Sequence, residues 1–247
     1  MSVRLTIAKT TCVGILVCFA SFFAIVAQAQ PNPAQTLQRT RDAYLALKSY
    51  SDSGVLVHEF ATSSQDRHAF TTYFNRAPRG FLLDFRQQEG DRYVIWGDPD
   101  AFHTWWQATD QRYDYPNPNN VAAFSGLPQA AGAALKVPTL LYGNSTLAAK
   151  MLDIADPLFD GSEDLSGHRC YRITGRASDV YAATGKEVNV HRVTVWIDAE
   201  SFLVRKMLEE WKTIPGQRWR DITTFEPQAN PALDASRFKF APPVPKR

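Results

Sequence analysis

The chain has 247 residues, of which 45% are apolar and 12% are aromatic, with 27 Lys and Arg residues against 25 Asp and Glu residues. This composition excludes a disordered chain, a collagen-like chain and a small disulfide-bonded scaffold. The length is sufficient for one sizeable hydrophobic core.

The first 29 residues have the features of a secretory signal peptide. Arg4 and Lys9 form a basic start, residues 11–26 form an apolar stretch, and residues 27–29 (Ala-Gln-Ala) form a small-x-small cleavage site. An uncleaved N-terminal anchor is the alternative, but the apolar stretch is short and the cleavage site is well formed. We therefore expect a cleaved signal at 1–29 and an exported single domain at 30–247.

Loss of the signal would leave a chain with no net charge. The signal contains two basic and no acidic residues, so 25 basic residues remain against 25 acidic ones. We therefore expect no nucleic-acid partner and no polybasic contact with a membrane. Cys170 is the one cysteine outside the signal, so an internal disulfide is excluded.

The first part of the domain predicts a helix followed by strands. Residues 33–49 favour an amphipathic helix, because Leu37, Tyr44 and Leu47 fall near helical spacing. The next runs are rich in Phe, Val and Tyr and are separated by Ser, Asp, Pro and Gly, as is typical of strands. These predicted strands are residues 55–60, 68–75, 81–86, 93–96 and 102–106.

An alanine-rich insertion at 116–152 interrupts the strands. Alanine at this density does not suit strands, and Pro128 and Pro138 prevent one long helix. We expect two or three short helices there. Their modest apolar faces contain Val121, Phe124, Leu127, Leu140, Leu141, Leu147 and Met151.

The rest of the chain returns to strands. Acidic residues between Asp153 and Asp164 predict a solvated surface near a turn, and strands follow at 168–175, 188–198, 202–212 and 217–226. A last short strand is expected at 237–240. In total about nine to eleven strands follow one another without βαβ alternation, which predicts an antiparallel sheet.

Several strands are apolar on both faces, as in Tyr93 and Ile95 against Val94 and Trp96. An antiparallel sheet with one solvated face should alternate cleanly, so both faces need covers. The insertion and the N-terminal helix are the available covers. We expect a mostly β protein with some α, in which a curved antiparallel sheet forms a half-open β-barrel with short lid helices on its concave face. A β-sandwich with a solid core fits the same pattern.

Three segments resemble the periplasmic lipoprotein-carrier (LolA-like) family. They are YFNRAPRGFLLDFR at 73–86, RYVIWGDPDAFHTWW at 92–106 and the tail LDASRFKFAPP at 233–243, which is similar to the family's closing strand. The order of signal, helix, strands and helical insertion also matches. The resemblance implies a half-open barrel with an apolar cavity for acyl chains, closed by a helical lid.

In that family an arginine of an Arg-Pro turn helps to hold the lid shut. Here Ala77 separates Arg76 from Pro78, and Arg79 is a second candidate for this role. The residues that we expect at the cavity and lid are Arg76, Phe81, Leu83, Phe85, Trp96, Phe124, Leu127, Leu140, Leu141, Leu147, Met151, Val195 and Ile197.

Catalytic and metal chemistry find little support. His168, Cys170 and His191 are the one metal-like group, and a hairpin centred near residue 181 would bring His191 close to Cys170. Zinc usually takes three or four ligands, and a fourth is missing here. The serines form no nucleophile elbow and the glycines no phosphate loop. We predict no metal, no cofactor and no catalysis.

The sequence therefore predicts a periplasmic, monomeric, non-enzymatic carrier of a lipophilic small molecule or of lipoprotein acyl chains. The alternative is an envelope sensor, a regulatory protein-interaction domain on the same fold with a protein partner. The expected single domain leaves no second partner-binding domain, which favours the carrier.

Overall fold

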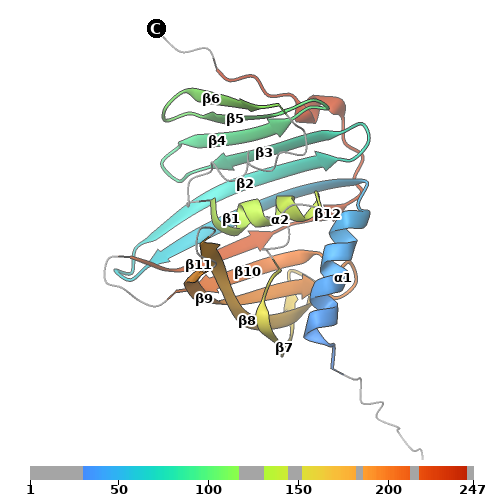
Figure 1. The fold of residues 1–247 in the computed structure, drawn as a ribbon, viewed down its shortest axis with the longest axis vertical. Helices are drawn as coiled ribbons and strands as arrows, with labels where there is room; N and C mark the ends of the chain where they lie inside the picture. Colours follow the sequence, from blue (N-terminus) through green and yellow to red (C-terminus); the bar gives the residue numbers. More distant parts are fainter. Residues whose placement is uncertain (1–29, 117–130, 144–151, 182–185, 212–216, 244–247) are drawn as a thin grey trace, which may run out of the picture. The chain divides into compact units, whose positions relative to one another are not determined.

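Twelve β-strands form one antiparallel sheet in the part of the chain that the structure describes (Figure 1). The computed structural model describes residues 30–116, 131–143, 152–181, 186–211 and 217–243. The chain divides into two units, Met1–Gln30 and Pro31–Arg247, and the fold described below is that of the second unit. The expected signal at 1–29 and much of the expected lid lie outside the described residues.

The sheet follows the chain as a meander with one long-range join. The strand order is β6-β5-β4-β3-β2-β1-β11-β10-β9-β8-β7, with β1 paired to β11 and to the short β12. Because β6 and β7 lie at opposite ends of this order, the sheet is curved but unclosed. This confirms the half-open barrel over the sandwich. The strands are β1 (Ser49–Phe60), β2 (Gln65–Asn75), β3 (Gly80–Arg86), β4 (Arg92–Gly97), β5 (Phe102–Trp106), β6 (Gln111–Tyr115), β7 (Ala155–Leu165), β8 (His168–Tyr181), β9 (Lys186–Asp198), β10 (Val204–Glu210), β11 (Arg218–Phe225) and β12 (Gln228–Ala229).

Helix α1 (Pro33–Ala46) begins where the sequence places a cap and a proline. The Asn32 side chain accepts a hydrogen bond from the Gln35 amide at 3.0 Å, and Pro33 occupies the first turn, where its missing N–H costs nothing. The hydroxyl of Tyr44 accepts a hydrogen bond from the Val204 amide at 3.2 Å. This bond joins α1 to β10.

Helix α2 (Gly132–Leu140) is the described part of the predicted insertion, and it lies across β1 and β11 (Figure 1). Gly132 has φ +44°, and a Cβ there would lie 3.2 Å from the Leu56 side chain of β1. The buried Ala133 and Ala134 bring the helix close to the sheet. We call the face that α1 and α2 cover the inner face, and its opposite the outer face.

The core lies between the inner face and the two helices. Alternate residues of β3, Phe81, Leu83 and Phe85, are buried there, because side chains along a strand alternate between faces. Val195 and Ile197 of β9 are buried in the same cluster. The expected covers of one face, the N-terminal helix and the insertion, are thus in place.

The outer face carries a second, smaller apolar cluster of Leu82, Val94, Trp96 and Trp105. Neither helix covers it. The C-terminal segment does, with the Phe240 ring 5.0 Å from that of Trp96. The predicted strand at 237–240 is wrong. Instead, a 3₁₀ turn, η3 (Ala235–Phe238), is capped by the Asp234 side chain, which accepts from the Ser236 amide at 2.7 Å.

Three strands and one register differ from expectation, because β6, β7 and the two-residue β12 are absent from the prediction. The side chains of β6 and β7 show little apolar alternation, and β7 carries the acidic stretch as an edge strand. The β8–β9 hairpin turns later than residue 181. His191 therefore lies opposite Ala177, and Cys170 lies opposite Asp198.

Candidate functional site

Most of the predicted cavity residues gather in one apolar layer on the inner face. Within the described residues this layer contains Phe81, Leu83, Phe85, Leu140, Leu141, Val195 and Ile197, each no more than 3% exposed. Side chains of α1 and α2 fill the space above them. Trp96 does not join the layer, because Ile95 faces inward and the next residue must face outward. Phe124, Leu127, Leu147 and Met151 lie outside the described residues.

Arg76 connects the ends of both helices. Its guanidinium donates to the carbonyl oxygens of Leu47 at 2.9 Å, Leu45 at 3.0 Å and Leu141 at 3.2 Å. The first two lie at the end of α1, and the third directly follows α2. The planar fork of an arginine suits several acceptors at once. A single side chain from the β2–β3 turn therefore holds both helix ends.

Arg79, the second candidate, makes a different contact. Its guanidinium lies over the Tyr142 ring, 5.4 Å from the centroid. Tyr142 in turn packs edge-on against Phe74, Phe81 and Phe102, with centroid separations of 5.5, 5.9 and 5.6 Å. Burial raises the pKa of the Tyr142 hydroxyl well above its usual value. The Tyr142 ring therefore packs the segment that follows α2 against β2, β3 and β5.

A charged group lies beneath α2 on the inner face. Glu209 of β10 accepts hydrogen bonds from Lys136 of α2 and from Nε2 of His191, the latter at 3.1 Å. The His191 ring stacks on Trp211 at 4.8 Å. Burial raises the pKa of Glu209, but Lys136 and His191 lower it by more, to about 2. Glu209 is therefore a buried carboxylate at neutral pH.

Asp221 of β11 lies opposite Glu209 in the strand register. Its Oδ1 is 2.6 Å from Nδ1 of His58 and 3.1 Å from Nε of Arg218. Sequence reasoning missed both carboxylates. The sequence signal that could have found them is strand alternation. Glu209 lies two residues after the buried Met207, and Asp221 lies two residues before the buried Thr223, so both carboxylates belong to the face that packs in the core.

A pocket of about 280 Å³ lies at the β4–β6 end of the inner face. Four of its lining residues are aromatic, and Tyr113 among them is 55% exposed. Nε1 of Trp106 donates to Asp91 at 2.5 Å, which fixes the indole at the pocket. The sequence did not reveal this site, because β6 was not predicted. The lining residues are Tyr93, Thr104, Trp106, Thr109, Gln111, Tyr113 and Tyr115.

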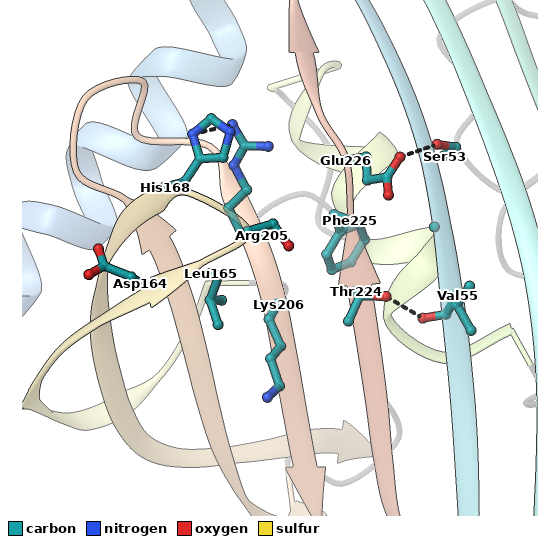
Figure 2. Close-up of a pocket in the computed structure, with 12 residues that line it drawn as sticks. Ser53, Val55, Asp164, Leu165, His168, Arg205, Lys206, Thr224, Phe225 and Glu226 are labelled. Atoms are coloured by element: carbon teal, nitrogen blue, oxygen red, sulfur yellow. Dashed lines mark hydrogen bonds between the residues drawn. The ribbon is translucent and has the colours of Figure 1, made fainter.

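A larger pocket of about 680 Å³ lies beside the β7–β8 turn, against β1, β10 and β11 (Figure 2). Figure 2 shows Arg205 meeting His168, a contact of 3.1 Å between Nη2 and Nδ1. The Ser53 hydroxyl bonds to Glu226 at 3.0 Å. Lys206 lies over the Trp196 ring at 4.5 Å. The polar groups of this pocket thus largely engage one another.

The three metal-like residues do not come together. His168 lies 3.0 Å from an Asp198 oxygen, whereas His191 turns to Glu209 on the inner face. Cys170 is buried, and burial raises the pKa of its thiol to about 11. Among the described residues, no three or more His, Cys, Asp or Glu side chains form a group that would hold a metal ion. In the same residues, no helix has the length and apolar character to cross a membrane.

Comparisons with known proteins find similarity in structure alone. No family model matches the sequence, and no curated protein matches it. The lipoprotein LppX of Mycobacterium tuberculosis is similar at 12% identity and a TM-score of 0.48, over 83% of this chain and 99% of that one. The MucA/MucB complex of Pseudomonas aeruginosa is similar at 14% identity and a TM-score of 0.44, over 85% of this chain and 62% of the matched chain. A LolA superfamily protein from Nitrosomonas europaea is similar at 7% identity and a TM-score of 0.33, over 85% of this chain and 98% of that one.

Proposed function

We propose that this protein is an exported, non-enzymatic carrier for a lipophilic, acylated ligand, which enters the inner face when α2 moves aside. The observation that supports this most is the large apolar cluster on the inner face, which one short helix covers over β1 and β11. The ligand would contact Phe81, Leu83, Phe85, Val195 and Ile197. The predicted lid residues Leu140 and Leu141 belong to the cover.

The free energy of burying an acyl chain is similar to that of burying the apolar side chains of the cover, so a ligand can replace the helix on the inner face. Three aliphatic residues of the cover, Val137, Leu140 and Leu141, are fully or almost fully buried. Together they contribute on the order of 5–9 kcal/mol of burial. A palmitoyl chain supplies about 0.8 kcal/mol per methylene, thus on the order of 10 kcal/mol before ordering costs. A bound acyl chain therefore offsets the loss of the helix contacts, and the returning helix assists release.

We propose Arg76, rather than Arg79, as the residue that holds the cover closed. Arg76 donates to a backbone carbonyl directly after α2 while it also holds the end of α1. Arg79 instead contacts the ring and the hydroxyl of Tyr142. Loss of Arg76 therefore removes a direct tie between the cover and the rest of the domain.

Photo-crosslinking with a neutral diazirine-bearing acyl ester tests the location of the ligand. Strand β3 supplies its own control, because Leu83 and Phe85 face inward while Leu82 faces outward. We expect labels on Leu83 and Phe85 and none on Leu82 or Trp96. Equal labelling of both faces would contradict the proposal.

Native mass spectrometry of the protein purified from its own periplasm tests the function itself. We expect an acyl-containing molecule in stoichiometric amount that leaves on organic extraction. We also expect the protein mass to correspond to a chain that begins near residue 30. A clean ligand-free mass, together with no uptake of a neutral fluorescent acyl ester, would overturn the carrier proposal. That result would favour the regulatory protein-interaction domain.

A further inference from the structure

The buried carboxylate of Glu209 takes its permanently charged partner from the cover, while the sheet supplies the imidazole of His191. Its side chain is 3% exposed, between Met207 of its own strand and Val193 across the sheet. Its cationic partner, Lys136, belongs to α2 and is itself 34% exposed. Movement of α2 therefore removes the charge that balances Glu209.

A second carboxylate oxygen lies beneath the first turn of α2. Asp221 is 1% exposed, and while its Oδ1 contacts His58 and Arg218, its Oδ2 has no hydrogen-bond partner in the described structure. This oxygen lies 3.4 Å from where a Cβ on Gly132 would be. The buried hydroxyl of Thr223, on the same face of β11, likewise has no partner there. Buried acceptors of this kind are normally satisfied.

The charges of this group balance only while α2 is in place. Glu209 pairs with Lys136, and Asp221 pairs with Arg218. His58 and His191 each face one of the carboxylates and complete the group. When α2 moves, two carboxylates remain with one permanently charged cation, Arg218. An unpaired buried carboxylate is strongly unfavourable, so the open inner face requires a replacement cation.

We propose that a cationic group of the ligand, of the primary amine class and close to its apolar chain, replaces Lys136 at Glu209 and reaches Asp221 Oδ2. This deepens the proposed function and rests on it, because Glu209 is accessible only when α2 moves. An anionic group would meet two carboxylates here, and a neutral one would leave Glu209 uncompensated. The cavity thus selects lipophilic cations.

Three probes with the same alkyl chain, dodecylamine, dodecanol and dodecanoate, test the proposal at neutral pH. Their affinities are measured by displacement of a neutral fluorescent probe from residues 30–247. We expect dodecylamine to bind about tenfold more tightly than dodecanol, and dodecanoate to bind most weakly. Glu209→Gln should abolish the preference for the amine and leave dodecanol binding unchanged.

Glu210→Gln is the matched control, because Glu210 is the next residue of β10 and points to the other face. It should retain the amine preference. Lys136→Met should increase the preference, since the ligand then supplies the only cation for Glu209. This variant also keeps the test decisive if Glu209→Gln does not fold, as judged by circular dichroism.

The outcomes separate the two proposals. Equal affinity for all three probes in the wild type, or an unchanged amine preference in both Glu209→Gln and Lys136→Met, overturns the cation site and leaves the carrier function standing. No binding of any probe overturns the carrier function, and the cation site with it.

Discussion

Replacement of Arg76 by alanine should loosen α2 and accelerate ligand exchange. The substitution removes three hydrogen bonds to the carbonyls of Leu45, Leu47 and Leu141. Each bond contributes about 0.5–1.5 kcal/mol, so loss of all three should lower the free energy of unfolding by about 1.5–4.5 kcal/mol. Only the bond to Leu141 acts on the cover. Its loss should raise the ligand release rate by about two- to tenfold.

Stopped-flow release of a neutral fluorescent acyl ester measures the exchange rate, and urea unfolding measures the free energy of unfolding. Arg79→Ala is the matched control, and its release rate should change less, because Arg79 contacts the Tyr142 side chain whereas Arg76 donates to the backbone at both helix ends. Arg76→Lys should be intermediate, since an ammonium lacks the planar fork that reaches several carbonyls. If Arg76→Ala releases ligand at the wild-type rate, or if Arg79→Ala has the larger effect, Arg76 does not hold the cover closed.

Two further substitutions test the fold around the site. Burial raises the pKa of Asp52 to about 7, against partial lowering by its hydrogen bonds with Tyr50 and the Glu226 amide. Because the folded pKa lies above the unfolded one, the stabilising contribution of Asp52 is complete below about pH 4, and on the order of 4 kcal/mol of it is lost as the pH rises to about 7. In Asp52→Asn this pH dependence of the free energy of unfolding should be much reduced, and an unchanged slope would argue against a buried acid at this position. Phe240→Ala should cost about 1–2 kcal/mol, because this half-buried ring covers Trp96 on the outer face. The same variant should expose the indole to acrylamide quenching while ligand affinity stays unchanged, and an unaltered quenching constant would show that the C-terminal segment is not the cover.

Local patterns predicted the elements with strong periodicity. The helical spacing of Leu37 and Tyr44 predicted α1, and the alternation of Phe81, Leu83 and Phe85 predicted β3 and its apolar face. The strands β6 and β7 lack such alternation, since an edge strand buries little of either face. Their existence depends on backbone pairing with a neighbour, and composition does not record that pairing.

The candidate site was predictable in its apolar part and not in its polar part. The layer of Phe, Leu, Val and Ile residues follows from strand parity once the strands are known. The charged group does not, because Glu209 and Lys136 are 73 residues apart and meet only when α2 crosses the sheet. The aromatic pocket with Trp106 and Tyr113 likewise needed the β5–β6 pairing.

The sequence by itself determined an antiparallel β protein with one N-terminal helix, a helical insertion and two apolar faces that each need a cover. These features depend on neighbouring residues, whose spacing sets the face to which each side chain points. Only the tertiary structure decided which segment covers which face. Phe240 of the C-terminal segment and α2 reach opposite sides of the sheet through long-range packing, and the register of β8 and β9 separates His191 from Cys170. Contacts between distant segments depend on the assembly and curvature of the whole sheet, and short-range spacing carries no record of them.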